Sequence, residues 1–199
     1  TMSDLRVLDL GAGNGIVADH LRELGVKHVV GADIIPEAKE AAERDYPGLY
    51  ADYFVEDFTK LSDDDRKRLR ANKLNSLITV AALGFGDIPP RAYAEAFNAV
   101  SNGGWIALSI KETFLRPSRD QSGFAAFISR LIEEGIFEMV AWQRHHHRLS
   151  IAGEELFYVA MVGRKRADVP MSIIEEREAA DRADEAHQKS MTFVTGEPA

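Results

Sequence analysis

The stretch Val7-Leu8-Asp9-Leu10-Gly11-Ala12-Gly13-Asn14-Gly15 decides the fold of this chain. A short apolar run ends in three glycines at alternate positions, and apolar residues then recur at helical spacing from Ile16 to Leu24. This pattern predicts a buried parallel strand, a tight turn and a helix. Glycines in the turn leave out the Cβ atoms that would keep a ligand away from the backbone. We therefore expect a ligand site at the carboxyl end of the first strand.

Strands and helices alternate along the rest of the chain. The predicted strands are residues 5–10, 28–32, 52–56, 75–83, 105–110, 137–142 and 156–162, and the predicted helices are residues 16–24, 36–45, 63–71 and 123–134, with a further helix beginning at Pro89 and Pro90. This order predicts an α/β, Rossmann-like, doubly wound and mostly parallel seven-stranded sheet with an antiparallel C-terminal hairpin. Residues 1–166 form this domain, and residues 167–199 are expected to be a charged tail, either helical or disordered.

Composition narrows the class of protein. The 199 residues, 45% of them hydrophobic, suffice for one α/β domain with a short appendage. A formal net charge of −8 disfavours general binding to nucleic acid or to anionic membranes, because both are negatively charged. Without cysteine there is no disulfide and no thiolate zinc site. No long apolar span or signal-peptide pattern is present, so we expect a cytoplasmic protein.

Three predicted strands end in a carboxylate. Asp9 precedes the glycines, where it would repel the pyrophosphate of a dinucleotide but tolerate an amino acid beside a sulfonium. Ile16 stands where a dinucleotide-binding fingerprint has its third glycine, and no Gly-Lys-Ser/Thr follows to form a phosphate-binding loop. Asp33 is placed to accept hydrogen bonds from ribose hydroxyls, which suits NAD equally. Asp57, beside Phe58, is either an acceptor for an adenine amino group or an ordinary turn residue.

Five motifs in order resemble the class I S-adenosylmethionine-dependent methyltransferases. They are VLDLGAGNG (7–15), GADIIPEA (31–38), VEDF (55–58), ITVAALG (78–84) and GGWIALSI (103–110). The resemblance extends over residues 5–165. Residues 84–97, 109–114 and 127–140 are further similar to the methyltransferase-like family of the Williams–Beuren syndrome region and its bacterial relatives.

The resemblance implies S-adenosylmethionine as cofactor and assigns roles by position. The methionine part would lie among Asp9, Gly11, Ala12, Gly13 and Asn14; the ribose would be held by Asp33; the adenine would contact Ile34, Asp57 and Phe58; and Ala81 to Leu83 would line the floor of the site. Family members carry helices ahead of the first motif, whereas here the first predicted strand begins at Leu5. We expect a partner, a second copy in a homodimer, the acidic tail or a segment outside this sequence to cover the site, or the site to be open.

Few residues qualify as a general base for the acceptor. Asp87, after the fourth predicted strand, and Lys111 and Glu112, after the fifth, are the candidates, and Phe85 lies beside Asp87 where the substrate is expected. Ordinary loop and capping chemistry is the favoured explanation of all four residues.

The run His145-His146-His147 lies between two arginines. If it is extended, His145 and His147 share one face, where they would be placed to act as bases or to contact an anionic substrate, or they simply form an exposed edge. We expect no metal site there. Trp105 and Trp142 are expected to be core or sheet-face residues.

Three functions follow from these patterns. The first is S-adenosylmethionine-dependent methyl transfer to a small-molecule acceptor. The second is a non-catalytic module that binds S-adenosylmethionine or S-adenosylhomocysteine. The third is an NAD-dependent oxidoreductase, which Asp33 permits but Asp9 and Ile16 oppose.

Overall fold

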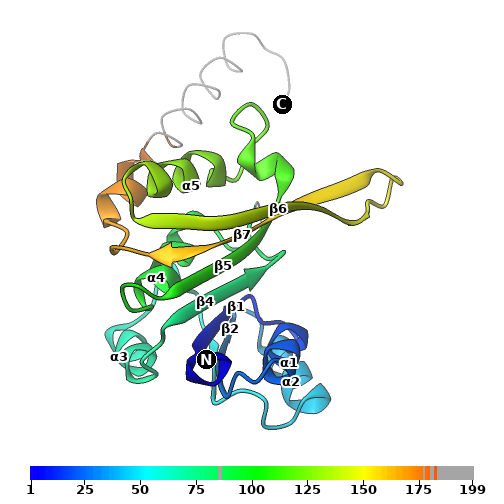
Figure 1. Cartoon of the computed structure of the whole chain (residues 1–199), viewed down its shortest axis with the longest axis vertical. Coiled ribbons are helices and arrows are strands. Elements are labelled where there is room, and N and C mark those ends of the chain that lie inside the picture. Colours follow the sequence, from blue (N-terminus) through cyan, green and yellow to red (C-terminus); the bar gives the residue numbers. More distant parts are fainter. Residues whose placement is uncertain (85–86, 177, 180–181, 183–199) are drawn as a thin grey trace. The chain divides into compact units, whose positions relative to one another are not determined.

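The computed structural model describes residues 1–84, 87–176, 178–179 and 182, so Phe85 and most of the charged tail predicted at 167–199 lie outside the described residues. The chain divides into two compact units, Thr1–Asp168 and Val169–Ala199. The first unit contains the whole sheet (Figure 1). In the second, residues 171–176 are helical. Within the described ranges, no helix is long and apolar enough to span a membrane.

The first unit is a seven-stranded sheet with the order β3-β2-β1-β4-β5-β7-β6. The strands are β1 Arg6–Leu10, β2 His28–Asp33, β3 Asp52–Val55, β4 Ser76–Val80, β5 Trp105–Lys111, β6 Phe137–Leu149 and β7 Glu155–Lys165. The first five strands are parallel to one another, and β7 runs antiparallel to both β5 and β6. The predicted Rossmann-like, doubly wound sheet with an antiparallel C-terminal hairpin is confirmed.

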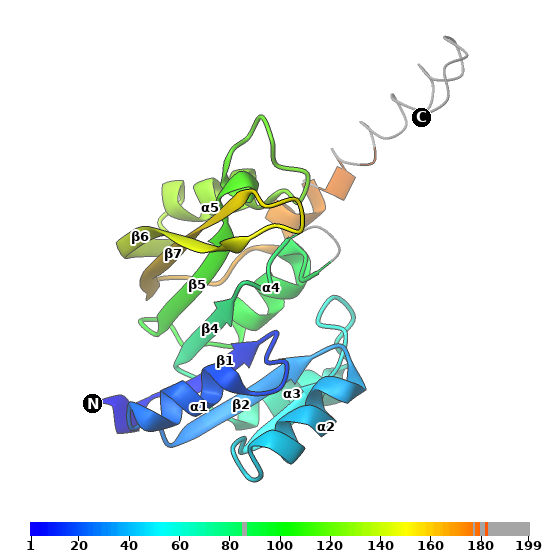
Figure 2. The ribbon, with the colours of Figure 1, turned by 90° about the vertical axis from the view of Figure 1, so that its right-hand side faces the viewer.

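Helices cover the sheet on both faces (Figure 2). They are α1 Ile16–Glu23, α2 Pro36–Asp45, α3 Asp63–Ala71, α4 Pro90–Asn98 and α5 Phe124–Glu133, with short 3-10 turns η1 Met2–Asp4 and η2 Glu112–Leu115. Helix α1 packs through Ala18 against Val7 and Val29, and Ala42 of α2 packs against Tyr53 on the same face. On the opposite face, Tyr93 of α4 contacts Phe124 and Phe127 of α5 edge-to-face.

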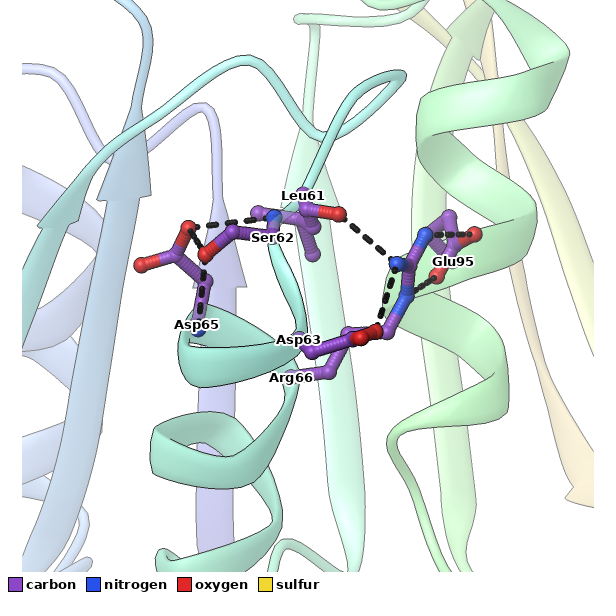
Figure 3. A network of polar contacts seen from close by, with 6 residues as sticks. All are labelled: Leu61, Ser62, Asp63, Asp65, Arg66 and Glu95. Carbon is purple, nitrogen blue, oxygen red and sulfur yellow. Dashed lines mark hydrogen bonds and ion pairs between the residues drawn. The ribbon is translucent and has the colours of Figure 1, made fainter.

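Helix α3 is fixed at its first turn by side-chain hydrogen bonds (Figure 3). Ser62 and Asp65 form a capping box, in which the Ser62 hydroxyl accepts from the Asp65 amide and the Asp65 carboxylate accepts from the Ser62 amide. Arg66 then donates to the Glu95 carboxylate at 2.9 Å and to the Leu61 carbonyl at 2.7 Å. These contacts join α3 to α4.

The hairpin is longer than the sequence predicts. β6 continues through the three histidines to Leu149, and its edge is exposed over almost its whole length. Because β5 ends at Lys111, opposite Tyr158, the hairpin extends beyond the rest of the sheet (Figure 1). β4 is shorter than predicted, since Ala81 has a left-handed backbone with φ 55° that cannot continue the strand.

Neither tryptophan belongs to the buried core, so only the sheet-face part of that prediction is confirmed. The Arg164 guanidinium lies 3.4 Å from the Trp105 ring centroid. Trp142 lies on β6 opposite Met161 and is 62% exposed. An edge strand has no neighbour on one side, which leaves its large side chains accessible.

The buried lysine Lys165 fastens the last strand to the end of α4. Its side chain is 1% exposed, and its ammonium group donates to the carbonyls of Asn98 and Val100 at 3.2 and 2.6 Å. The last carbonyls of a helix lack partners within the helix and carry partial negative charge. Asp168 pairs with the same ammonium group. Lys165 therefore satisfies backbone groups that would otherwise be buried without a donor.

Replacing Lys165 by methionine should lower the free energy of unfolding by about 2 kcal/mol, because two buried carbonyls lose their donor. Urea denaturation followed by circular dichroism measures this loss. Arg166→Met is the matched control, since Arg166 is an exposed neighbouring cation whose guanidinium pairs with the Glu138 carboxylate at the surface. Equal stability of the two variants would contradict the assigned role of Lys165.

Candidate functional site

A cavity opens at the carboxyl ends of the parallel strands, where the strand order reverses between β1 and β4. Its volume is about 410 Å³, which lies in the range of small-molecule sites. In doubly wound sheets, ligands bind at this reversal because the loops on its two sides diverge. The cavity is lined by Leu10, Gly11, Ala32, Asp33, Ile34, Ile35, Glu56, Asp57, Phe58, Ala81, Ala82, Asp87, Ile88, Pro89 and Ala92.

The glycine turn after β1 forms one wall of this cavity. Gly11 has φ 77°, and a Cβ atom there would lie 2.5 Å from the Cβ of Ala82. Only glycine therefore lets β1 and the end of β4 approach this closely. Gly13 has φ 51°, and its carbonyl accepts a hydrogen bond from the Tyr53 hydroxyl at 3.0 Å. The turn is thus held at Gly11 by its contact with Ala82 and at Gly13 by the hydrogen bond from Tyr53.

Asp33 links the glycine turn to the end of β2. One carboxylate oxygen accepts from the Gly13 amide at 3.0 Å, and the other accepts from the Ile35 amide at 3.2 Å. Each carboxylate oxygen has two lone pairs, so acceptor capacity is left for ribose hydroxyls. Ile34, which follows in the cavity wall, is 63% exposed. It offers the apolar surface on which a flat ring can lie.

Asp57 and Phe58 line the cavity from the end of β3. One Asp57 oxygen accepts from the amide and hydroxyl of Thr59 at 2.9 and 2.6 Å, and hydrogen bonds from Thr59 hold the pKa of this carboxyl below its usual value. The turn role weighed for Asp57 is therefore realised, and its other oxygen lies 3.6 Å from the Lys60 ammonium. Phe58 is buried and packs edge-to-face on Phe54.

Asp9 is buried below the glycine turn and does not line the cavity. The Tyr50 hydroxyl donates to one of its carboxylate oxygens at 3.0 Å. The other oxygen has no hydrogen-bond partner among the described residues. Burial, opposed by the Tyr50 hydrogen bond and assisted by the charge of Asp33, raises the pKa of Asp9 from 3.8 to about 7.

The structure brings together most of the residues predicted to bind a cofactor. Gly11, Asp33, Ile34, Asp57, Phe58 and Ala81 line one cavity, whereas Asp9, Ala12, Gly13, Asn14 and Leu83 lie outside its lining. Sequence reasoning missed Ile88, Pro89 and Ala92, which close the side opposite β2. The proline pair that begins α4 was the available signal, because a helix starting after β4 must begin at this same edge.

The residues considered as a general base separate into two groups. Asp87 lines the cavity. Lys111, His145 and His147 lie on the hairpin side of the sheet, on β5 and β6. Glu112 accepts from Arg116 and Arg144, and these hydrogen bonds lower the pKa of its carboxyl, so it serves as an ion-pair partner. No cluster of three or more His, Asp or Glu able to hold a metal occurs in the part of the chain that the structure describes.

Comparison with known protein families agrees with the geometry of this cavity. The model of a methyltransferase domain matches residues 8–108, slightly more than half of the chain. The chain belongs to this methyltransferase family. Comparison with curated proteins gives no match. The family implies S-adenosylmethionine as cofactor, and the residues present fit it: four carboxylates and apolar surface line the cavity, and a Cβ at Gly11 would clash with its wall at Ala82 and Ile88.

Solved structures of the same fold support the assignment of the fold. A Thermoplasma acidophilum protein is 21% identical, with 81% of this chain and 76% of that chain covered and a TM-score of 0.58. A methyltransferase dependent on S-adenosylmethionine from Methanosarcina mazei is 19% identical, with coverages of 81% and 92% and a TM-score of 0.57. The [4+2]-cyclase SpnF is 15% identical, with coverages of 83% and 79% and a TM-score of 0.59.

Replacing Asp9 by asparagine should stabilise this methyltransferase domain in a pH-dependent way. The folded pKa near 7 exceeds the unfolded value of 3.8, so the native state binds the proton more tightly and loses stability as the pH rises from about 4 to 7. The asparagine variant lacks this loss. The difference between its free energy of unfolding and that of the unmodified chain should therefore grow by on the order of 2 kcal/mol between pH 5 and pH 8. Urea denaturation at both pH values measures it. Asp64→Asn, at an exposed position on α3, is the control. Its free energy of unfolding should change between the two pH values by as much as that of the unmodified chain.

Proposed function

We propose that this chain transfers the methyl group of S-adenosylmethionine to a small-molecule acceptor. The observation that carries the proposal is the cavity that Asp33 and Asp57 line together with Ile34 and Phe58. Carboxylates next to apolar surface suit a ribose and an adenine ring, whose hydroxyl and amino groups donate hydrogen bonds. The narrower similarity to the Williams–Beuren syndrome region family is consistent with this reading and identifies no acceptor.

Each group of residues has a definite task in such a reaction. When bound, the cofactor supplies a methyl group already activated on a sulfonium. Asp33 would hold the ribose, and Asp57 and Phe58 would hold the adenine. The side formed by Asp87, Ile88 and Pro89 would receive the acceptor and align its reacting atom, which can contribute several kcal/mol to lowering the barrier. Asp87 is the cavity carboxylate on that side, placed to take up a proton from the acceptor.

A small acceptor is favoured by the size and the charge of the site. The cavity of about 410 Å³ is bounded by loops at the sheet edge. The chain has a net charge of −8, which opposes the counterion-driven attraction that nucleic acids require. A binding module without methyl transfer is the second candidate, because the fold alone does not fix the chemistry.

Cofactor binding is tested first by thermal denaturation with S-adenosylhomocysteine, S-adenosylmethionine and NAD. A ligand at one hundred times its dissociation constant should stabilise the chain by about 2.7 kcal/mol. We expect this shift with both adenosyl ligands and none with NAD. Asp33→Ala should abolish it, while Asp64→Ala, an exposed carboxylate on α3, should retain it. Asp33→Asn, which can still accept from the Gly13 amide, separates loss of the ribose contact from loss of the loop anchor.

Stabilisation by NAD alone would reject the methyltransferase proposal and favour the oxidoreductase.

Methyl transfer itself is tested by the release of S-adenosylhomocysteine in the presence of fractionated small molecules. We expect release with at least one fraction, and a loss of about a hundredfold in Asp87→Asn if its carboxylate accepts the proton. The folded state of the variant is checked by its stabilisation with S-adenosylhomocysteine. Binding of the cofactor without release in every fraction would favour the non-catalytic module instead.

A further inference from the structure

The β6–β7 hairpin gathers several polar side chains on one face around Tyr158. Lys111 of β5 and His145 of β6 are both directly opposite Tyr158 in the antiparallel register. Residues directly opposite one another in such pairs project from the same face of the sheet. The His147 ring lies 4.3 Å from the Tyr158 ring, and the His145 ring lies 6.4 Å from it. The three strands therefore present Lys111, His145, His147 and Tyr158 together.

A register shift adds a second cation to this face. Pairing slips between His146 and Arg148, so that Arg148 lies opposite Leu156, two residues before Tyr158 on β7. Alternate residues of a strand share a face, which places Arg148 on the side of Tyr158. The charge of Arg148 also acts on Tyr158. Burial raises the pKa of the Tyr158 phenol above its usual value, the charge of Arg148 opposes this shift, and the charge of Asp87 adds to it.

Lys111 and Asp87 both come from the carboxyl edge of the parallel strands, where the cavity opens. Asp87 lines the cavity on the side assigned above to the acceptor. Its charge adds to the raised pKa of the Tyr158 phenol, after the larger effect of burial. Lys111, the last residue of β5, also lies at the carboxyl edge of the parallel strands, as the cavity does. A molecule that occupies the acceptor side can thus extend toward the hairpin.

The two cations of this face have no carboxylate partner in the described ranges of the chain. Neither Lys111 nor Arg148 forms an ion pair there, and the Lys111 ammonium lies 5.7 Å from the Phe114 ring centroid. On the opposite face of β6, by contrast, the arginine has a carboxylate partner. Arg144 is held by the Glu112 carboxylate at 3.0 and 3.2 Å, and it lies 3.5 Å from the centroid of the Phe157 ring.

We propose that Lys111, Arg148 and the Tyr158 hydroxyl bind an anionic group, a carboxylate or a phosphate, of the methyl acceptor. This inference rests on the proposed function and assigns the class of acceptor: a small acidic molecule. An ammonium and a guanidinium provide charge-assisted donors, and the raised pKa keeps the Tyr158 phenol protonated as a neutral donor. Together they would hold the far end of the acceptor while Asp87 faces its reacting atom. They are binding residues and take no part in the transfer of the proton.

The test uses inorganic phosphate and acetate as probes on the full chain. Each is titrated at constant pH and ionic strength against sodium chloride, and the imidazole signals are followed by NMR after assignment with single histidine variants. We expect a saturable change at His145 and His147 and none at His146, whose ring lies edge-to-face with Phe157 on the other face. Lys111→Gln and Arg148→Gln should each weaken binding by about tenfold, because each removes a charged donor.

Arg144→Gln is the matched control, since it removes a cation of the same hairpin from the opposite face and should leave the titration unchanged. The proposal is overturned if neither probe gives a saturable change at His145 and His147, or if Lys111→Gln and Arg148→Gln both leave it unchanged. Tighter binding of phosphate than acetate would point to a phosphorylated acceptor, and the reverse to a carboxylic acid.

Stabilisation by S-adenosylhomocysteine is measured on every sample. It confirms that the variants fold, and it keeps the two proposals separate. If the cofactor analogue stabilises the chain but neither anion binds, only the acceptor class is wrong. If the analogue fails to stabilise the unmodified chain, the proposed function is wrong whatever the titrations show.

Discussion

The hydrogen bond from the Gly13 amide to the Asp33 carboxylate joins the two segments on which the site depends. It ties the turn after β1 to the end of β2, and the Ile35 amide holds the other oxygen of the same carboxylate. A carboxylate fixed by two backbone donors keeps one position and still has lone pairs free. One side chain therefore fixes this wall of the cavity and keeps lone pairs free for the ribose of the proposed cofactor.

The close approach of β1 to the end of β4 is the second constraint. Gly11 lies against Ala82 with no space for a Cβ, and Ala81 adopts a left-handed backbone where the strand stops. Left-handed geometry is unfavourable for a residue other than glycine and is kept only where the surrounding structure enforces it. Here it ends β4 beside Gly11, where Ala81 and Ala82 line the cavity together with Asp87 and Ile88.

Buried charge at the site reduces the stability of the fold. Asp9 lies under the glycine turn with one oxygen unpartnered among the described residues, and its raised pKa near 7 measures the cost of ionising it there. A structural role alone would be served better by an apolar side chain. A carboxylate retained at this position is the kind of local cost that proteins accept at functional sites. Lys165 is a contrast, since its buried charge is matched by two carbonyls and a carboxylate.

Sequence alone determined the class of fold, the order of its strands and helices, and the positions of Gly11, Asp33, Asp57 and Phe58 at the cavity. Periodicity and strand-end position are local properties, and the ends of parallel strands necessarily meet at one edge. Only the tertiary structure decided that Asp9 turns away from the cavity and that Thr59 occupies one oxygen of Asp57. It also decided that Lys111, His145, His147 and Arg148 share a face with Tyr158. That placement depends on strand register and on a bulge, which residues far apart in the chain fix together.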